Sequence, residues 1–241
     1  MQMTTAISEH TAKAFDVDLQ ELARLVAEMG GLAEKQIADS IEALAKRDGE
    51  RAKRVIGLDS SIDTLQHEIE NKAMLTIARR QPMAVDLRQI VGALRVAGDI
   101  ERIGDLAKNI AKRVASTGGD FHPQKVIRGV EHMTAMVLGQ LKAVLDSYAS
   151  QDVVKALAVW KGDQEVDAMC TSLFRELLTY MMEDPRNITL CIHLMFCAKN
   201  IERMGDHATN IAETVYYMIE GRMIADERPK GDTLAALVDK S

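Results

Sequence analysis

IERIGDLAKNIA, residues 100–111, returns almost unchanged as IERMGDHATNIA at residues 201–212. The two copies begin about 101 residues apart, and a repeat of that length is domain-sized, so the chain has two similar halves. Each copy places a Glu, an Asp and an Asn at intervals of four residues. On a helix this spacing produces one polar stripe.

The stripe points away from the apolar face of the same helix. At about 100° per residue, Ile103 and Ala107 fall on one apolar side. Glu101, Asp105 and Asn109 fall nearly opposite that side, so the carboxylates are not core residues.

Two features of the stripe are costly for an ordinary solvated helix. Like charges four residues apart destabilise a helix by a few tenths of a kcal/mol, and a glycine such as Gly104 costs on the order of 1 kcal/mol relative to Ala. A bound cation, the adjacent Arg102 and Arg203, or a basic partner surface could offset these costs. The glycine could also allow a neighbouring backbone or ligand to approach closely.

The composition indicates a helical protein with a large core. The 241 residues are 47% hydrophobic, only 4% aromatic and 27% charged, with four prolines. The net charge of −6 argues against general nucleic-acid binding, which needs basic patches.

The sequence also indicates the cellular compartment in which the protein works. Its three cysteines, Cys170, Cys191 and Cys197, have no paired spacing, which indicates a reducing compartment. We find neither a signal peptide in residues 1–18 nor an apolar run of membrane-spanning length, so we expect a cytoplasmic protein with no membrane insertion.

Apolar spacing and punctuation by Gly and Pro predict six helices joined by short turns. The expected helices cover Asp16–Lys46, Glu50–Arg80, Val85–Ala115, Pro123–Ala149, Asp152–Glu183 and Arg186–Gly221. We therefore predict an all-α fold of two tandem antiparallel three-helix bundles. The first bundle is residues 1–116 with a loose start before Phe15, followed by a linker at 117–122. The second is residues 123–221, and a mobile tail, 222–241, could hold a short helix at 233–239.

A second pair of carboxylates lies on the flank of the second expected helix. Asp59 and Asp63 could converge with Glu101 and Asp105 on one outer groove of the first bundle. The matching set in the second bundle is Asp163, Asp167, Glu202 and Asp206. Carboxylates without thiolates suit hard cations such as Mg²⁺, Mn²⁺, Ca²⁺ or iron, and His207 could add a nitrogen ligand in the second half only.

Motifs of the common catalytic sites are absent from the sequence. We find no Glu-x-x-His pair of a di-iron bundle, no phosphate loop, no His-Glu-x-x-His zinc motif and no Gly-x-Ser-x-Gly elbow. The six histidines form no tight cluster. We therefore predict a non-enzymatic protein with no catalytic residues.

The sequence resembles the PhoU family of bacterial phosphate-signalling regulators over almost its whole length, from about Phe15 to Gly221. The resemblance rests on the doubled Glu-Arg-x-Gly-Asp-x-Ala-x-Asn-Ile signature at 101–110 and 202–211. It also rests on MGGL at 29–32, QP at 81–82, DLR at 86–88 and EDPRNI at 183–188.

This resemblance implies two three-helix bundles with pseudo-twofold symmetry, often dimeric, some of which hold metal on the bundle surface. It implies metal ligands at Glu101, Asp105, Glu202 and Asp206, with Asp59, Asp63, Asp163 and Asp167 as co-ligands. Arg102, Arg203, Asn109, Asn210 and His207 would support these ligands. The ion would be divalent or ferric, namely iron, manganese, magnesium or zinc.

The resemblance also implies a function. PhoU-like proteins repress the phosphate-starvation response when phosphate is ample, and link the ATPase of the phosphate transporter to a sensor histidine kinase. We expect a negative regulator of this kind, working as a homodimer. The alternatives are a metal-dependent enzyme acting on phosphate esters and a helical scaffold without metal.

Overall fold

A computed structural model describes residues 2–116 and 123–228 of the chain. Its helices are α1 (Gln2–Lys46), α2 (Gly49–Arg80), α3 (Val85–Ser116), α4 (Gln124–Ser150), α5 (Val153–Glu183) and α6 (Ile188–Glu220), with a short 3₁₀ turn, η1 (Pro185–Asn187), before α6. Apart from the start of α1, every end lies within two residues of the expected position. The expected linker at 117–122 and the tail beyond residue 228, with its possible helix at 233–239, lie outside the described residues.

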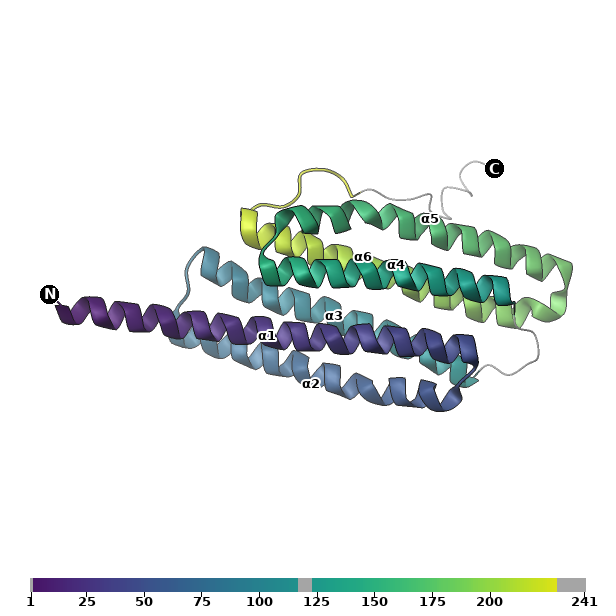
Figure 1. Cartoon of the computed structure of the whole chain (residues 1–241), viewed down its shortest axis with the longest axis horizontal. Helices are drawn as coiled ribbons and strands as arrows, with labels where there is room; N and C mark the ends of the chain where they lie inside the picture. The colour runs from purple at the N-terminus through teal and green to yellow at the C-terminus, as the bar shows by residue number, and fades with distance from the viewer. Residues whose placement is uncertain (1, 117–122, 229–241) are drawn as a thin grey trace.

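The start of α1 differs from the expectation of a loose N-terminal segment. The helix begins at Gln2 instead of near Asp16, and in Figure 1 it extends beyond the other helices at this end. Residues 2–15 contain neither Gly nor Pro, so no residue in this segment stops the helix from continuing toward the N-terminus.

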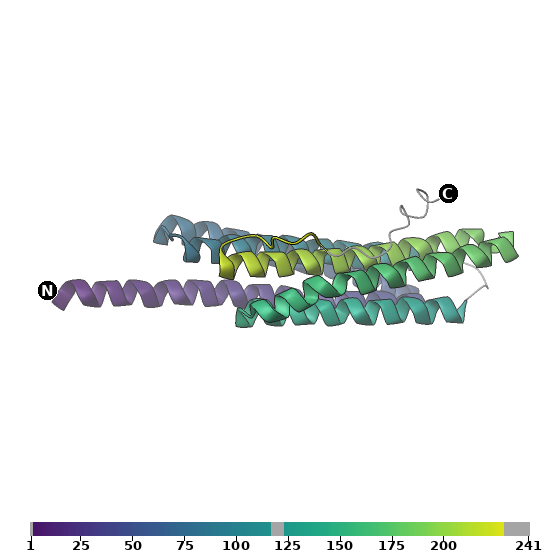
Figure 2. The ribbon, with the colours of Figure 1, turned by 90° about the horizontal axis from the view of Figure 1, so that it is seen from above.

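The expected all-α fold of two tandem bundles is confirmed. Helices α1, α2 and α3 pack together, as do α4, α5 and α6. The two bundles lie side by side along their length, with α3 against α6 and α1 against α4 (Figures 1 and 2). One continuous apolar core runs through both bundles, so neither is an isolated unit.

Short capped turns set the lengths of the helices. The Asp48 side chain accepts a hydrogen bond from the Arg51 backbone N–H at 2.9 Å and caps the start of α2. Asp152 caps α5 in the same way. Helix α2 ends at Arg80, and the capping residue Gln81, immediately before Pro82, has a left-handed backbone.

These helices are long, yet each carries polar faces. Within the described ranges, no helix is both long enough and apolar enough to cross a bilayer.

A polar network crosses the interface between the bundles. Asp99 of α3 accepts hydrogen bonds from two residues of α6: its Oδ1 lies 2.8 Å from Nδ1 of His207 and 3.3 Å from Nδ2 of Asn210. Further along, the Arg113 guanidinium lies 4.1 Å from the centre of the Phe196 ring. From the first contact to the second, the residue number increases along α3 and decreases along α6. The two helices are therefore antiparallel, and these contacts fix their register.

The glycines of the repeated motif face the interior. A Cβ atom on Gly104 would lie 2.9 Å from Cδ1 of Ile62 and 3.0 Å from Oε1 of Gln36, both closer than normal contact. At the matched Gly205 the nearest atoms are 3.5 Å away, an ordinary contact distance. Close packing of α3 against α1 and α2 therefore explains the glycine at 104, while space alone would admit Ala at 205.

We predict that Asp99→Ala lowers the free energy of unfolding by about 1–3 kcal/mol, because His207 and Asn210 lose their acceptor at a half-buried interface. Urea denaturation followed by circular dichroism measures this change. Asp146→Ala, which removes an exposed carboxylate from α4, is the control and should change stability by less than about 0.5 kcal/mol. Equal effects of the two substitutions would contradict the role assigned to the network.

Candidate acidic clusters

The first acidic cluster lies between α2 and α3 and consists of Asp59, Asp63, Glu101 and Asp105. The Lys108 ammonium group lies within it, 2.8 Å from Oδ1 of Asp105 and in direct contact with Oδ2 of Asp59. Asp59 is buried and the other carboxylates are half-buried. The cluster therefore has a cation of its own, supplied by the helix that carries the repeated motif.

Burial and charge shift the ionisation of this cluster. Desolvation raises the pKa of Glu101 above its usual value, and the neighbouring Asp105 and Asp63 raise it further while Arg102 opposes them. Burial lowers the pKa of Lys108, but its hydrogen bonds to Asp105 and Asp59 outweigh this, so its pKa is raised overall. Lys108 therefore remains a cation at neutral pH.

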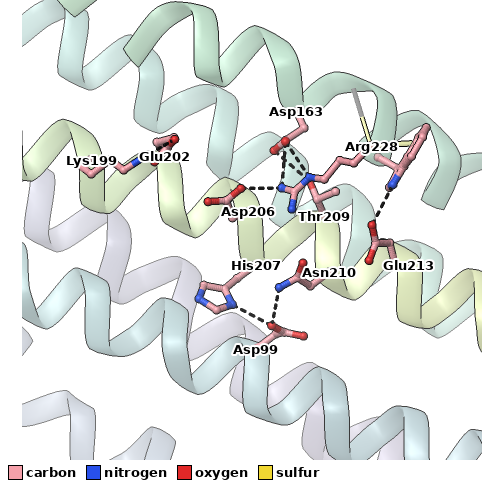
Figure 3. A network of polar contacts seen from close by, with 11 residues as sticks. Asp99, Asp163, Lys199, Glu202, Asp206, His207, Thr209, Asn210, Glu213 and Arg228 are labelled. Atoms are coloured by element: carbon pink, nitrogen blue, oxygen red, sulfur yellow. Dashed lines mark hydrogen bonds and ion pairs between the residues drawn. The ribbon is translucent and has the colours of Figure 1, made fainter. Parts of the chain in front are cut away.

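The second acidic cluster lies between α5 and α6 and consists of Asp163, Asp167, Glu202 and Asp206. In Figure 3 the Arg228 side chain reaches into it from the segment after α6. Its Nε donates to Oδ2 of Asp163 at 3.0 Å, and its Nη2 donates to Oδ1 of Asp206 at 2.8 Å. One guanidinium thus bridges a buried carboxylate of α5 and a half-buried carboxylate of α6.

The second cluster is also shaped by burial. Desolvation raises the pKa of Asp163, the Arg228 charge opposes this shift, and Asp167 and Asp206 add to it. Desolvation likewise raises the pKa of Glu202, although Lys199 donates a hydrogen bond of 2.6 Å to its Oε1. Negative charge is therefore costly in this cluster, and cations offset part of the cost.

The two clusters obtain their cations from different places. Lys108 occupies the same position in the first copy of the motif as Thr209 in the second. Thr209 cannot supply charge, and its hydroxyl donates instead to Oδ1 of Asp163 at 3.1 Å. The missing cation comes from Arg228, outside the repeat. Residue 228 lies in the segment expected to be a mobile tail, and its ion pairs join it to the buried Asp163 and the half-buried Asp206.

The residues expected to support metal ligands lie in three different places. Arg102 lies beside the first cluster, with its Nε 3.4 Å from Oε2 of Glu101, while Arg203 and Asn109 are exposed. His207 and Asn210 instead bind Asp99 across the interface between the bundles (Figure 3). His207 follows Asp206 directly, and one helical residue turns its side chain by about 100°, toward α3.

Cations of the chain itself contact carboxylates of both clusters. In the described ranges, no three His, Cys, Asp or Glu side chains are grouped so that they could hold an ion. Lys108 contacts Asp59 and Asp105, and Arg228 contacts Asp163 and Asp206, so these two residues give four of the eight carboxylates a cationic partner within the chain. The residues in this conformation therefore do not fit a metal ion, and we derive no chemical step through one.

We predict that Glu202→Gln stabilises the protein at pH 7. The pKa of Glu202 in the folded state is above the ordinary value of 4.5. Its contribution to the stability of the folded protein is therefore complete below pH 4.5 and is lost as the pH rises through the raised pKa. The amide of Gln does not ionise, so the variant avoids this loss of stability. Its free energy of unfolding should exceed that of the unaltered chain at pH 7 but not at pH 4. Urea denaturation at both pH values measures it, with the exposed Glu165→Gln as control. A gain of equal size at both pH values would contradict the assignment.

Comparison with known proteins adds a family match in each half. The family model described as the PhoU domain matches residues 26–114 and again residues 130–215. These two ranges contain all eight carboxylates and Lys108, but not Arg228.

Curated relatives and solved structures agree with this match. A protein of Rhizobium meliloti named phosphate-specific transport system accessory protein PhoU homolog is 56% identical over 95% of this chain and 96% of its own length. A Caulobacter vibrioides protein of the same name is 49% identical over 95% of this chain and all of its own. The crystal structure of PhoU from Pseudomonas aeruginosa has a TM-score of 0.80 at 36% identity, covering 86% of this chain and all of that one. The structure titled phosphate transport system regulatory protein PhoU from Streptococcus pneumoniae has a TM-score of 0.81 at 25% identity, covering 88% of this chain and all of that one.

Proposed function

This chain belongs to the PhoU family, and from that premise we propose that it is a non-enzymatic accessory protein of a phosphate transport system that represses the phosphate-starvation response. The observation that carries the proposal is the 56% identity to a phosphate-transport accessory protein over nearly the full length of both chains. The Streptococcus pneumoniae structure, whose title calls that protein regulatory, supports a regulatory role.

We further propose that it acts as a messenger between two partners. One is the ATPase subunit of the phosphate ABC transporter, and the other is the sensor histidine kinase of the phosphate regulon. Such an adaptor would work from the cytoplasm as a homodimer, without binding nucleic acid. Two similar faces on one folded unit suit this task, because the two bundles share one apolar core and pack against each other.

Deleting the gene should switch on a phosphate-starvation reporter in phosphate-replete cells, because repression is lost. Expression of the full chain should restore repression, and a tagged copy should capture the transporter ATPase and the sensor kinase. A reporter that remains off in the deletion strain would overturn the regulatory proposal. Hydrolysis of phosphate esters by the purified chain with Mn²⁺ or Fe²⁺, lost in Glu202→Ala/Asp206→Ala, would favour the enzyme alternative.

Metal binding at the acidic clusters stays a separate proposal. A divalent or ferric ion could bind only if Lys108 or Arg228 first left its carboxylates. The internal cations thus favour the alternative in which the clusters are structural and free of metal.

The two alternatives predict different metal contents. If metal binds, Glu101→Ala/Asp105→Ala and Glu202→Ala/Asp206→Ala should each reduce the metal content of purified protein by one site or more, because each removes two carboxylate ligands. Elemental analysis measures this change, with Asp146→Ala as control. Metal content equal to that of the unaltered chain in both double variants would rule out binding at the clusters.

A further inference from the structure

The segment that follows α6 runs back along the outside of the α5–α6 pair. Helix α6 ends at Glu220. Arg228 nevertheless contacts Asp206, about 14 residues before that end, and also Asp163 of α5. Because 14 helical residues span about 21 Å, residues 221–228 run antiparallel to α6 (the yellow coil in Figures 1 and 2). A chain that continues in this direction follows α5 and α6 toward the turn that joins them.

The surface ahead of this segment, which we call the α5–α6 face, changes from acidic to apolar. At about 100° per residue, Leu178 lies within about 20° of Asp167 around α5, and Ile192 lies about 40° from Asp206 around α6. The Leu178 and Ile192 side chains are 46% and 41% exposed and form what we call the apolar end of the face. Ile192 precedes Asp206 by about 14 residues, so this end lies about 21 Å beyond the contacts of Arg228.

The sequence PKGD at 229–232, outside the described residues, matches the acidic part of the α5–α6 face. Its proline and glycine disfavour a helix, so we expect an extended stretch. Lys230 then lies about 7 Å beyond Arg228, close to the about 6 Å that four helical residues span. Four residues beyond the two carboxylates that bind Arg228 are Asp167 on α5 and Glu202 on α6. The sequence thus supplies a second cation where burial makes negative charge costly.

The next residues, TLAALVD at 233–239, match the apolar end of the face. An aspartate, a favoured N-cap residue, precedes them. Three apolar residues recur at the spacing of one helical face: Leu234, Leu237 and Val238. Four extended residues reach about 13 Å beyond Arg228, and seven helical residues add about 10 Å. The apolar side of this helix can therefore reach Leu178 and Ile192.

We propose that residues 229–241 dock on the α5–α6 face of the same chain and cover its apolar end. Lys230 lies over the acidic part of the face, and the helix at 233–239 packs on the apolar end. The length of this segment, the order of its charged and apolar residues, and the place where residue 228 leaves it all support this occupant. The inference goes beyond the proposed function and does not rest on it.

This docking makes the two bundles different at their ends. In the first bundle, Met74 follows Asp59 at the interval at which Leu178 follows its own matched carboxylate, and Met74 is 58% exposed. The chain after α3 leads on to α4, so the first bundle has no counterpart of residues 229–241 in the sequence. The second bundle therefore covers its own apolar end, and the first leaves the equivalent surface to a partner.

Hydrogen exchange measured by mass spectrometry on the full chain tests the docking. Backbone amides of residues 234–239 should exchange slowly in the unaltered chain and about tenfold or more faster in Leu178→Ser/Ile192→Ser, which removes the apolar end. Both side chains are exposed, so the substitution should leave the bundle folded. Met74→Ser/Leu87→Ser is the matched control, because it changes exposed residues at the equivalent end of the first bundle and should leave this exchange unchanged.

A charge variant tests the acidic part of the face independently. Lys230→Glu should also speed the exchange of residues 234–239, because it replaces attraction to the carboxylates by repulsion. Lys240→Glu makes the same change of charge beyond the expected helix and should have a smaller effect. Since Lys230 lies outside both bundles, this variant keeps the test decisive should the serine variant fold poorly by circular dichroism.

Two results of the exchange experiment would overturn the proposal. Exchange of residues 234–239 in the unaltered chain at the rate of an unstructured peptide would show that the segment does not dock. Slow exchange that Met74→Ser/Leu87→Ser abolishes and Leu178→Ser/Ile192→Ser does not would place the segment on the first bundle.

A cysteine pair decides whether the segment docks on its own chain or on a second copy. Under mild oxidation, Leu178→Cys/Leu237→Cys should form a disulfide within one chain. The natural cysteines are buried and burial raises the pKa of their thiols, so they should react slowly. A disulfide that forms only when the single variants Leu178→Cys and Leu237→Cys are mixed would place the segment on a second copy and overturn docking within the chain.

Discussion

The buried carboxylates between paired helices impose the constraint on which the site depends. Asp59 and Asp163 occupy matched places and are both nearly inaccessible to water, where an uncompensated negative charge is expensive. Each must be neutralised or bound by a cation. Lys108 does this in the first half and Arg228 in the second, so the same requirement is met by two unrelated residues.

The interface between the bundles shows a second departure from symmetry. Asp99 of α3 binds His207 and Asn210 of α6, but the residues at the exchanged positions are Asn200 and Leu106, which cannot form the same charged contact. A duplicated fold tolerates such divergence because one strong polar contact is enough to fix the register of α3 against α6. The two halves are therefore alike in backbone and unlike in chemistry, which suits a protein proposed to meet two different partners.

Periodicity and punctuation were sufficient to predict most of the fold. Asp48, Pro82 and the Asp184–Pro185 pair act on their own neighbours in the chain, so the ends of helices could be inferred without tertiary information. The start of α1 was wrong because loose ends were assumed where nothing in residues 2–15 breaks a helix. The convergence of carboxylates could also be inferred, because four-residue spacing places Glu101 and Asp105 on one helical face.

By itself, then, the sequence determined six helices in two matched sets, and which carboxylates face the α2–α3 and α5–α6 contacts. Tertiary structure alone decided what neutralises them. Lys108 is three residues from Asp105 and was visible in the motif, but its contact with Asp59 depends on how α2 packs against α3. Arg228 lies 65 residues from Asp163 and has no counterpart in the repeat, so no local spacing could place it there. Sequence spacing predicts contacts between residues one or two helical turns apart. The partner of a buried carboxylate can come from any part of the chain that the fold brings close to it.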